Sequence, residues 1–181
     1  MTLKVCFCRL LAAGLAVVLA PSALAIDSVS YEAGGGDNTQ LVRIGLQSFW
    51  QKKWWQSNGT HVGGYWDLTL SRWRWASSQS ATQTDQYLND VGITPVLRLQ
   101  SDSQKGFYAE AGIGAHLLSD YYDTGGGRFS TRFQFGDHIG LGYVMQNGVD
   151  LALKLQHFSN GGIKQPNPGV TFGILKLGYA F

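Results

Sequence analysis

The residues best suited to chemistry in this chain are His157 and Ser159, which lie in the run His157-Phe158-Ser159-Asn160. A serine hydroxyl is a weak nucleophile until a neighbouring base takes its proton, and histidine can serve as that base because its pKa lies near neutrality. In an extended strand, residues i and i+2 share a face about 6–7 Å apart, a gap that long side chains can bridge. The spacing therefore indicates a serine esterase.

An esterase also needs hydrogen-bond donors for the oxyanion that forms on the attacked carbonyl. Asn160 follows the serine and could supply its side-chain amide, while Gly162 could supply a backbone N–H. A histidine and a serine separated by one residue are by themselves a weak motif. The alternative is an interfacial histidine beside a serine that hydrogen-bonds a loop.

The segment 149–159, which leads to this pair, alternates in polarity. Successive strand side chains point to opposite faces, and one face here is apolar up to the pair. That face consists of Val149, Leu151, Leu153 and Leu155, followed by His157 and Ser159. Polar groups that extend a lipid-facing apolar surface are costly unless they serve a purpose, so this context favours a catalytic role.

The rest of the chain is typical of strands as well, and no stretch keeps a helical period. Eight apolar or alternating segments cover residues 28–34, 39–50, 60–75, 87–100, 107–121, 131–145, 149–159 and 169–181. In the clearest of them one face is largely apolar, and the other carries charge and glycine. The pattern predicts an all-β fold.

Two features favour an eight-stranded antiparallel transmembrane β-barrel, with its apolar face outward. The segments are long enough to cross a bilayer at a tilt, and aromatic residues gather near their ends as in interfacial girdles. These aromatic residues are Trp50, Trp54, Trp55, Trp73, Trp75, Tyr121, Tyr122 and Tyr179. Such a barrel has no room for an open pore, so its inward charges must pair with one another. They include Asp90, Arg98, Glu110, Lys154 and Lys176.

The segment 60–75 is less regular than the others. Trp66, Leu68 and Leu70 share one parity, whereas Trp73 and Trp75 fall on the other. If all of these side chains face lipid, the strand must contain one extra residue. The pattern therefore predicts a β-bulge near positions 71–72.

The connections between the segments alternate in length. Short ones at 57–59, 101–106 and 147–148 alternate with longer ones at 76–86, 123–127 and 161–168. Outer-membrane barrels have short periplasmic turns and longer outer loops, so we expect both termini in the periplasm. His157 and Ser159 are then expected at the outer leaflet.

The N-terminal residues are typical of a secretory signal. Lys4 and Arg9 precede an apolar run at 10–20, and residues 23–25 fit the small-x-small motif that signal peptidase reads. The run is too short to span a bilayer as a helix. We therefore expect residues 1–25 to be a signal peptide that is removed, and residues 26–181 to form the barrel.

Both cysteines and the net positive charge belong to that segment. Cys6 and Cys8 lie within it, so the mature chain is expected to have no thiol and no disulfide. Removal of two basic residues takes the 14 basic residues to 12, which equals the 12 acidic residues. Nucleic-acid binding requires a basic surface, so we expect no nucleic-acid partner.

Several stretches together resemble a known family. They are residues 157–167 (HFSNGGIKQPN), 135–140 (FGDHIG), 53–56 (KWWQ) and 64–67 (GYWD). The chain resembles the PagL-type lipid A 3-O-deacylases over essentially its whole mature length. The resemblance implies an eight-stranded outer-membrane barrel that hydrolyses the ester-linked 3-position acyl chain of lipid A in lipopolysaccharide. It further implies Ser159 as nucleophile, His157 as base, and Asn160 with Gly162 as oxyanion or supporting residues.

One position departs from the best-known member of that family, in which a glutamate fourteen residues after the histidine orients it. Here that position is Thr171, which shares the lipid-facing parity but cannot carry the orienting charge. A Ser-His dyad or an acid from elsewhere must then suffice. Asp137, in the neighbouring segment, has the same parity as Phe133 and Phe135 and is the candidate orienting acid.

Further expectations concern ligands and partners. Lys164 is a candidate contact to a lipid A phosphate, with an exposed loop lysine as the alternative. The histidines at 61, 116 and 138 show no metal spacing, so neither a metal nor a cofactor is expected. The terminal aromatic Phe181 resembles the signal that the barrel-assembly machinery recognises. A homodimer is left open.

Three other functions compete with a lipid A esterase in the outer membrane. A lipid A palmitoyltransferase-like barrel would also use serine and histidine but needs an interior pocket for an acyl chain. A non-enzymatic small outer-membrane barrel would leave Ser159 expendable. A secreted ligand-binding barrel would turn its apolar face inward and would need no detergent after extraction.

Overall fold

The structure, a computed structural model, describes residues 25–76, 85–124 and 127–181. These ranges contain nine strands: β1 (Ser28–Gly36), β2 (Thr39–Phe49), β3 (Trp54–Ser57), β4 (Thr60–Ala76), β5 (Asp85–Ser101), β6 (Gly106–Leu118), β7 (Phe133–Val144), β8 (Val149–Ser159) and β9 (Val170–Ala180). The signal peptide expected at 1–25 lies outside the described residues except for its last position. No helix in the described ranges is long and apolar enough to cross a membrane.

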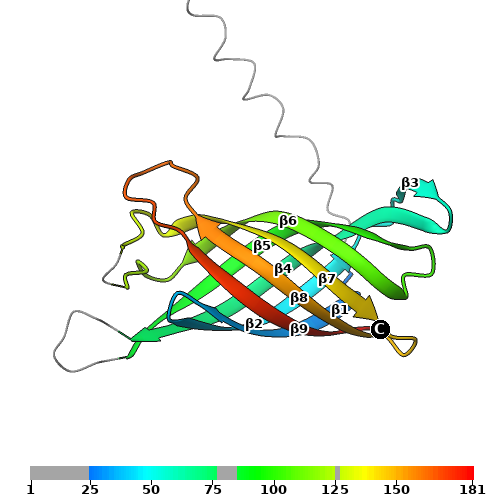
Figure 1. Cartoon of the computed structure of the whole chain (residues 1–181), viewed down its shortest axis with the longest axis horizontal. Coiled ribbons are helices and arrows are strands. Elements are labelled where there is room, and N and C mark those ends of the chain that lie inside the picture. The colour runs from blue at the N-terminus through cyan, green and yellow to red at the C-terminus, as the bar shows by residue number, and fades with distance from the viewer. Residues whose placement is uncertain (1–24, 77–84, 125–126) are drawn as a thin grey trace, which may run out of the picture.

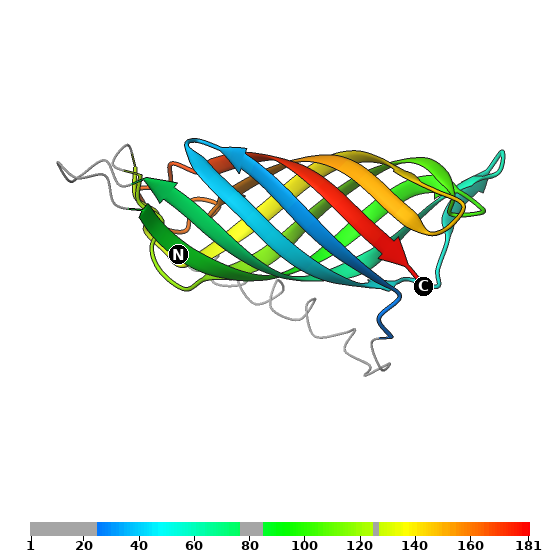
Figure 2. The ribbon, with the colours of Figure 1, turned by 90° about the horizontal axis from the view of Figure 1, so that it is seen from below.

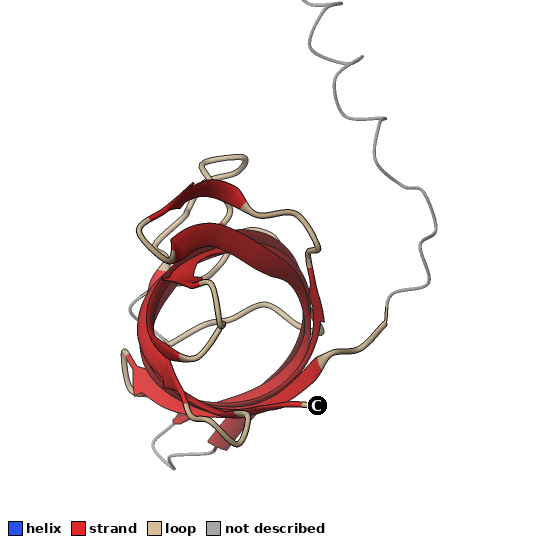
Figure 3. Ribbon diagram, turned by 90° about the vertical axis from the view of Figure 1, so that its right-hand side faces the viewer, coloured by secondary structure: helices blue, strands red, loops and turns tan. Residues whose placement is uncertain are grey.

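Eight of the strands close into a barrel. Neighbours in the ring pair antiparallel, and closure comes from the ladders of β1 with β9 and of β2 with β4. Figure 3 looks along the barrel axis at the closed ring. The expected eight-stranded antiparallel transmembrane β-barrel is confirmed.

The ninth strand, β3, was not expected from the sequence. It pairs with the start of β4, through Trp54 opposite Val62 and Ser57 opposite Thr60, and forms a small hairpin beyond the barrel wall (Figure 1). Its four residues are too few to show a period of two, so the alternation criterion missed it.

The barrel has two different ends (Figures 1 and 2). We call the end that holds Ser28 and Ala180 the terminus end. The opposite end, which we call the loop end, holds the turn at 37–38 and the connections 119–132 and 160–169. His157 and Ser159 lie at the loop end because β8 runs toward it and ends at Ser159.

Outward and inward side chains differ in polarity as the alternation predicts. In β8, Leu151, Leu153 and Leu155 are exposed, while Ala152 and Lys154 between them are buried. The same reversal around the whole barrel leaves an apolar outer surface that only lipid can cover favourably.

The inward charges pair inside the barrel, as expected. Arg98 contacts Glu110 at 2.7 Å, and Asp150 accepts from Lys176 at 3.0 Å. Additional inward ion pairs join Lys154 and Arg43 to Glu32, and Nδ1 of His116 lies 3.0 Å from Oδ1 of Asp90. Paired and hydrogen-bonded charges can be buried where single ones could not.

Near the loop end the interior is aromatic rather than charged. Trp73 and Trp75 are 0% and 5% exposed and pack edge-on against Tyr122, which is also buried. These three residues therefore do not belong to an interfacial girdle, and that part of the prediction was wrong.

The predicted bulge at 71–72 was also wrong. β4 pairs with β5 in unbroken register from Thr60 to Ala76, and with β2 from Tyr65 to Trp75. The parity change reflects a change in the interior: outward apolar residues continue to Leu70, and the inward face turns aromatic at Trp73. Alternation in polarity can thus reverse without any irregularity in the backbone.

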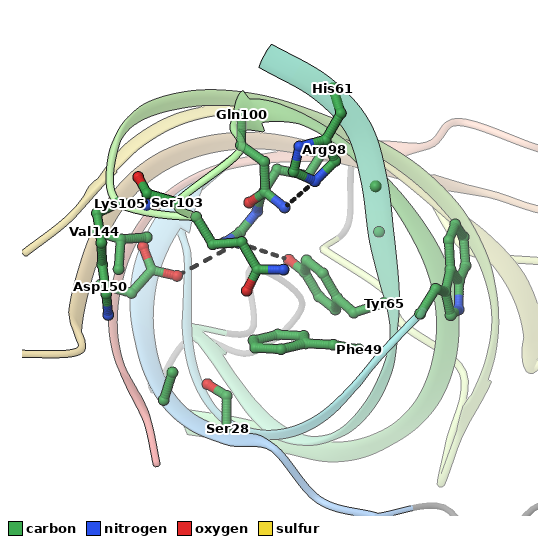
Figure 4. A pocket seen from close by; sticks show the side chains of 15 residues that line it. Ser28, Phe49, His61, Tyr65, Arg98, Gln100, Ser103, Lys105, Val144 and Asp150 are labelled. Carbon is green, nitrogen blue, oxygen red and sulfur yellow. Dashed lines mark hydrogen bonds and ion pairs between the residues drawn. The ribbon is translucent and has the colours of Figure 1, made fainter. Parts of the chain in front are cut away.

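A small cavity of about 80 Å³ opens at the terminus end (Figure 4). Its lining includes Arg98, whose guanidinium hydrogen-bonds Tyr65 and Asp150, and His61, whose Nε2 lies 3.3 Å from the amide of Gln100. Because this cavity lies at the opposite end from Ser159, it takes no part in the chemistry at the loop end.

Candidate active site

His157 and Ser159 lie on the outward face in the last three residues of β8, just before the 160–169 connection. Both side chains are half-buried. Phe158 between them points inward, is 0% exposed, and packs edge-on against Trp73 with ring centroids 4.8 Å apart. The aromatic interior thus anchors the strand from behind and holds the pair on a rigid element.

One imidazole nitrogen of His157 is already bound. Its Nδ1 lies 2.8 Å from Oγ1 of Thr171, the residue directly opposite it on β9. The residue that the sequence comparison placed at the position of an orienting acid, Thr171, therefore does contact the imidazole, through a hydroxyl and not a charge.

The other side of the imidazole faces the backbone of Gly169. A Cβ at Gly169 would lie 2.6 Å from His157 Cε1 and 2.9 Å from Nε2, and the glycine has φ +71°. Both the contact and the backbone conformation exclude larger residues. The ring is thus confined between Thr171 and Gly169.

Ser159 has two neighbours on its own face. The backbone N–H of Gly161 points to Ser159 Oγ at 3.4 Å, and Phe135 lies opposite the serine on β7. Among the described residues, no hydrogen bond joins Ser159 to His157. The two side chains therefore share a face in this structure but are not hydrogen-bonded to each other.

The Asn160 side chain is 1% exposed and organises the loop that follows the serine. Its Nδ2 donates to the carbonyl of Lys164 at 2.7 Å and to Oγ of Ser130 at 3.0 Å, and its Oδ1 accepts from the backbone N–H of Gly162 at 2.9 Å. Its own backbone N–H donates to Oδ1 of Asn167. The donors of Asn160 and Gly162 are therefore occupied within the loop.

Ser130 ties two connections together. Its hydroxyl donates to the carbonyl of Lys164 at 2.7 Å and accepts from Asn160, so the connection 119–132 is fastened to 160–169. The Lys164 side chain itself is exposed. Lys164 thus contributes its carbonyl to the loop and leaves its ammonium group in solvent.

Asp137 is in register with His157 on β7 and is exposed. In the described part of the chain it makes no hydrogen bond or ion pair with the histidine. The role of orienting acid therefore stays a prediction for Asp137.

Three residues near the site were not identified from the sequence: Asp37, Ser130 and Gly169. Asp37 and Ser130 approach the pair only because distant connections meet at the loop end, and no sequence pattern links them to His157. The glycine after Pro168 could have drawn attention as a turn.

Comparison with known proteins identifies the family. The family model for lipid A 3-O-deacylase (PagL) matches residues 40–180. The lipid A deacylase PagL of Pseudomonas aeruginosa is 31% identical over 160 residues, which cover 87% of this chain and 88% of the relative. That of Bordetella bronchiseptica is 34% identical over 164 residues, covering 84% and 83%.

Among solved structures, the crystal structure of the outer membrane enzyme PagL superposes with a TM-score of 0.71 at 27% identity. It covers 85% of this chain and 99% of that one. Family model, curated relatives and barrel geometry therefore agree, and the chain belongs to the PagL family of lipid A 3-O-deacylases.

Proposed function

We propose that this protein is an outer-membrane esterase that hydrolyses the ester-linked 3-position acyl chain of lipid A. Family membership supports lipid A deacylation in the outer membrane. The observation that carries the mechanism is that His157 and Ser159 share the outward face of β8, with Nδ1 of the imidazole bound by Thr171. If Nδ1–H donates to that hydroxyl, Nε2 keeps a free lone pair to act as base.

The reaction then proceeds in two steps. Ser159 Oγ attacks the ester carbonyl while its proton passes to His157 Nε2, and the tetrahedral intermediate collapses as the bond to the sugar oxygen breaks and that oxygen takes the proton. Water next attacks the acyl-enzyme and gives its proton to Nε2. The 3-hydroxy fatty acid leaves and the proton returns to Ser159.

The oxyanion needs donors near Ser159 Oγ. The backbone N–H of Gly161 lies 3.4 Å from Ser159 Oγ, close enough to turn from this oxygen to the carbonyl oxygen once Oγ has attacked the ester. Asn160 and Gly162 support it, because their mutual hydrogen bond holds the loop that presents Gly161. Lys164 is exposed beside this loop, where its ammonium could bind a lipid A phosphate.

The aromatic interior disfavours acyl transfer through the barrel. A palmitoyltransferase-like mechanism needs an interior pocket for an acyl chain, but the space behind the pair is filled by Phe158, Phe172 and Trp73. The substrate is expected to reach the pair from the lipid side.

We further propose that residues 1–25 are a signal peptide and that the loop end lies at the outer leaflet, where lipid A resides. Phe181 at the end of the chain is 71% exposed and is suited to recognition by the barrel-assembly machinery. A homodimer stays a prediction.

Mass spectrometry of lipid A tests the proposal. Cells that express the protein should lose the mass of one 3-hydroxy fatty acid from lipid A. Ser159→Ala and His157→Ala should each lower turnover on the order of 10³-fold or more, because such groups act as a unit. An unchanged lipid A spectrum with the folded barrel in the outer membrane would reject the proposed activity.

A further inference from the structure

The turn between β1 and β2 brings a carboxylate to the histidine from the far side of Thr171. Asp37 and Asn38 form this two-residue turn, with φ of 49° and 58°. Such left-handed conformations are typical of the tight hairpin turns that favour aspartate, asparagine and glycine. The turn therefore presents the Asp37 side chain in a defined direction at the loop end.

Glycine allows this turn to lie directly against β9. The last ladder pair between β1 and β9 joins Gly35 to Gly173, and a Cβ at Gly36 would lie 1.8 Å from the carbonyl oxygen of Thr171. Any other residue at Gly36 would push the turn away from Thr171.

The Asp37 carboxylate and His157 then contact the same residue. Oδ2 of Asp37 accepts the backbone N–H of Thr171 at 3.3 Å, and Oγ1 of Thr171 lies 2.8 Å from Nδ1 of the imidazole. The order along this chain of contacts is carboxylate, threonine, imidazole. Asp37 and Gly169, the glycine beneath the imidazole, also line one hollow at the loop end.

We infer that Asp37 is a positioning residue that replaces the missing acid of this family member. It acts through Thr171: the carboxylate holds the backbone of Thr171, the hydroxyl holds Nδ1, and the negative charge stabilises the imidazolium that forms when His157 takes the serine proton. No proton passes to Asp37 itself. The inference rests on the Ser-His mechanism proposed above.

Two aspartates lie near His157 through their neighbours: Asp37 binds the backbone of Thr171, and Asp137 is in register with the histidine on β7. Within the described ranges, Asp37 hydrogen-bonds the partner of the imidazole, whereas no hydrogen bond or ion pair is found at Asp137. Tyr122, which lines the hollow with Asp37, stays uncharged because burial raises the pKa of its phenol. Because Asp37 but not Asp137 binds Thr171, substitution of each aspartate in turn distinguishes their roles.

The decisive variant is Asp37→Asn, which keeps an acceptor oxygen and tolerates the left-handed backbone but removes the charge. With purified full-length protein and lipopolysaccharide in detergent micelles, release of 3-hydroxy fatty acid should show kcat lowered roughly tenfold, with KM within about twofold. Asp85→Asn serves as the matched control, because Asp85 is also an exposed aspartate near the loop end but pairs with Arg74.

A second experiment, in the Thr171→Glu variant, separates the effect of the Asp37 charge from its effect on the structure of the turn. In Thr171→Glu, which restores a carboxylate beside the imidazole, adding Asp37→Asn should change kcat by less than about twofold. The inference is overturned if Asp37→Asn has the same kcat as the Asp85→Asn control. It is also overturned if Asp37→Asn lowers kcat as much in the Thr171→Glu background as in the unmodified protein, or if only Asp137→Asn lowers kcat. An active Ser159→Ala variant would instead reject the Ser-His mechanism itself.

Discussion

At the scale of single residues, the hydroxyl of Thr171 holds one nitrogen of the imidazole. It lies 2.8 Å from Nδ1 of His157, and if it accepts Nδ1–H then Nε2 is the nitrogen left to act as base, but it brings no charge. The sequence alone indicated only that Thr171 cannot carry an orienting charge. The 2.8 Å contact indicates that its hydroxyl positions the imidazole.

Thr171→Val tests this role, because valine keeps the shape of threonine and removes the hydrogen bond. We expect kcat to fall roughly tenfold, since the imidazole loses its orientation in the transition state. Thr171→Ser, which keeps the hydroxyl, should stay close to the unmodified protein in the same turnover assay. Equal rates for the valine and serine variants would show that the hydroxyl is not used.

Gly169 has a role that depends on the absence of a side chain. Gly169→Ala places a Cβ within 2.6 Å of the imidazole and should lower kcat by roughly tenfold or more by displacing His157. Gly59→Ala is the control, because Gly59 also has a positive φ but has open space around it at the terminus end. Comparable activity losses in both variants would point to backbone strain alone.

At the scale of elements, β8 and the two connections at the loop end form one unit. The strand is anchored inward through Phe158, and the residues after Ser159 are held by the hydrogen bonds of Asn160 to Ser130 and Lys164. The geometry around the serine therefore depends on a connection that contributes no catalytic group.

Ser130→Ala should show this dependence. Loss of the hydroxyl leaves Asn160 with one acceptor fewer and unfastens the connection 119–132, so we expect kcat to fall roughly fivefold. Ser119→Ala is the matched control, since Ser119 Oγ accepts from the backbone of Asn89 instead of the active-site loop. If both serine variants have unaltered turnover, the tie between the connections does not position the site.

At the scale of the whole molecule, the barrel separates the outward face that carries His157 and Ser159 from an interior of buried, paired charges. Glu32 is fully buried and accepts hydrogen bonds from Arg43 at 3.1 Å and Lys154 at 3.0 Å. Removing one member of such a group leaves buried charge without compensation, which typically costs about 3–5 kcal/mol.

We therefore expect Glu32→Gln to lower the temperature at which the folded barrel converts to the unfolded band on SDS gels. Turnover of the folded fraction at low temperature should stay within about twofold, because the network does not contact the pair. The exposed Asp85→Asn variant should leave the transition nearly unchanged. A stable Glu32→Gln barrel would mean that the interior tolerates the unpaired cations.

The sequence by itself determined the barrel and the placement of His157 and Ser159 on one face of one strand, because both depend on local patterns. Period-two alternation distinguishes the faces of each strand without knowledge of its partner, and His157 and Ser159 lie close because they are near neighbours in one strand. The closing ladders and the inward ion pairs followed from that alternation and from the number of strands.

Only the tertiary structure decided what surrounds the pair. Asp37 and Thr171 are 134 residues apart in sequence, and Ser130 and Lys164 are 34 apart, and each contact exists because barrel closure brings different hairpins to one end. The inward orientation of Trp73 and Trp75 could not be predicted for the same reason. Alternation assigns a residue to one face of its strand. Whether that face meets charge, aromatic rings or lipid at a given depth depends on all eight strands together.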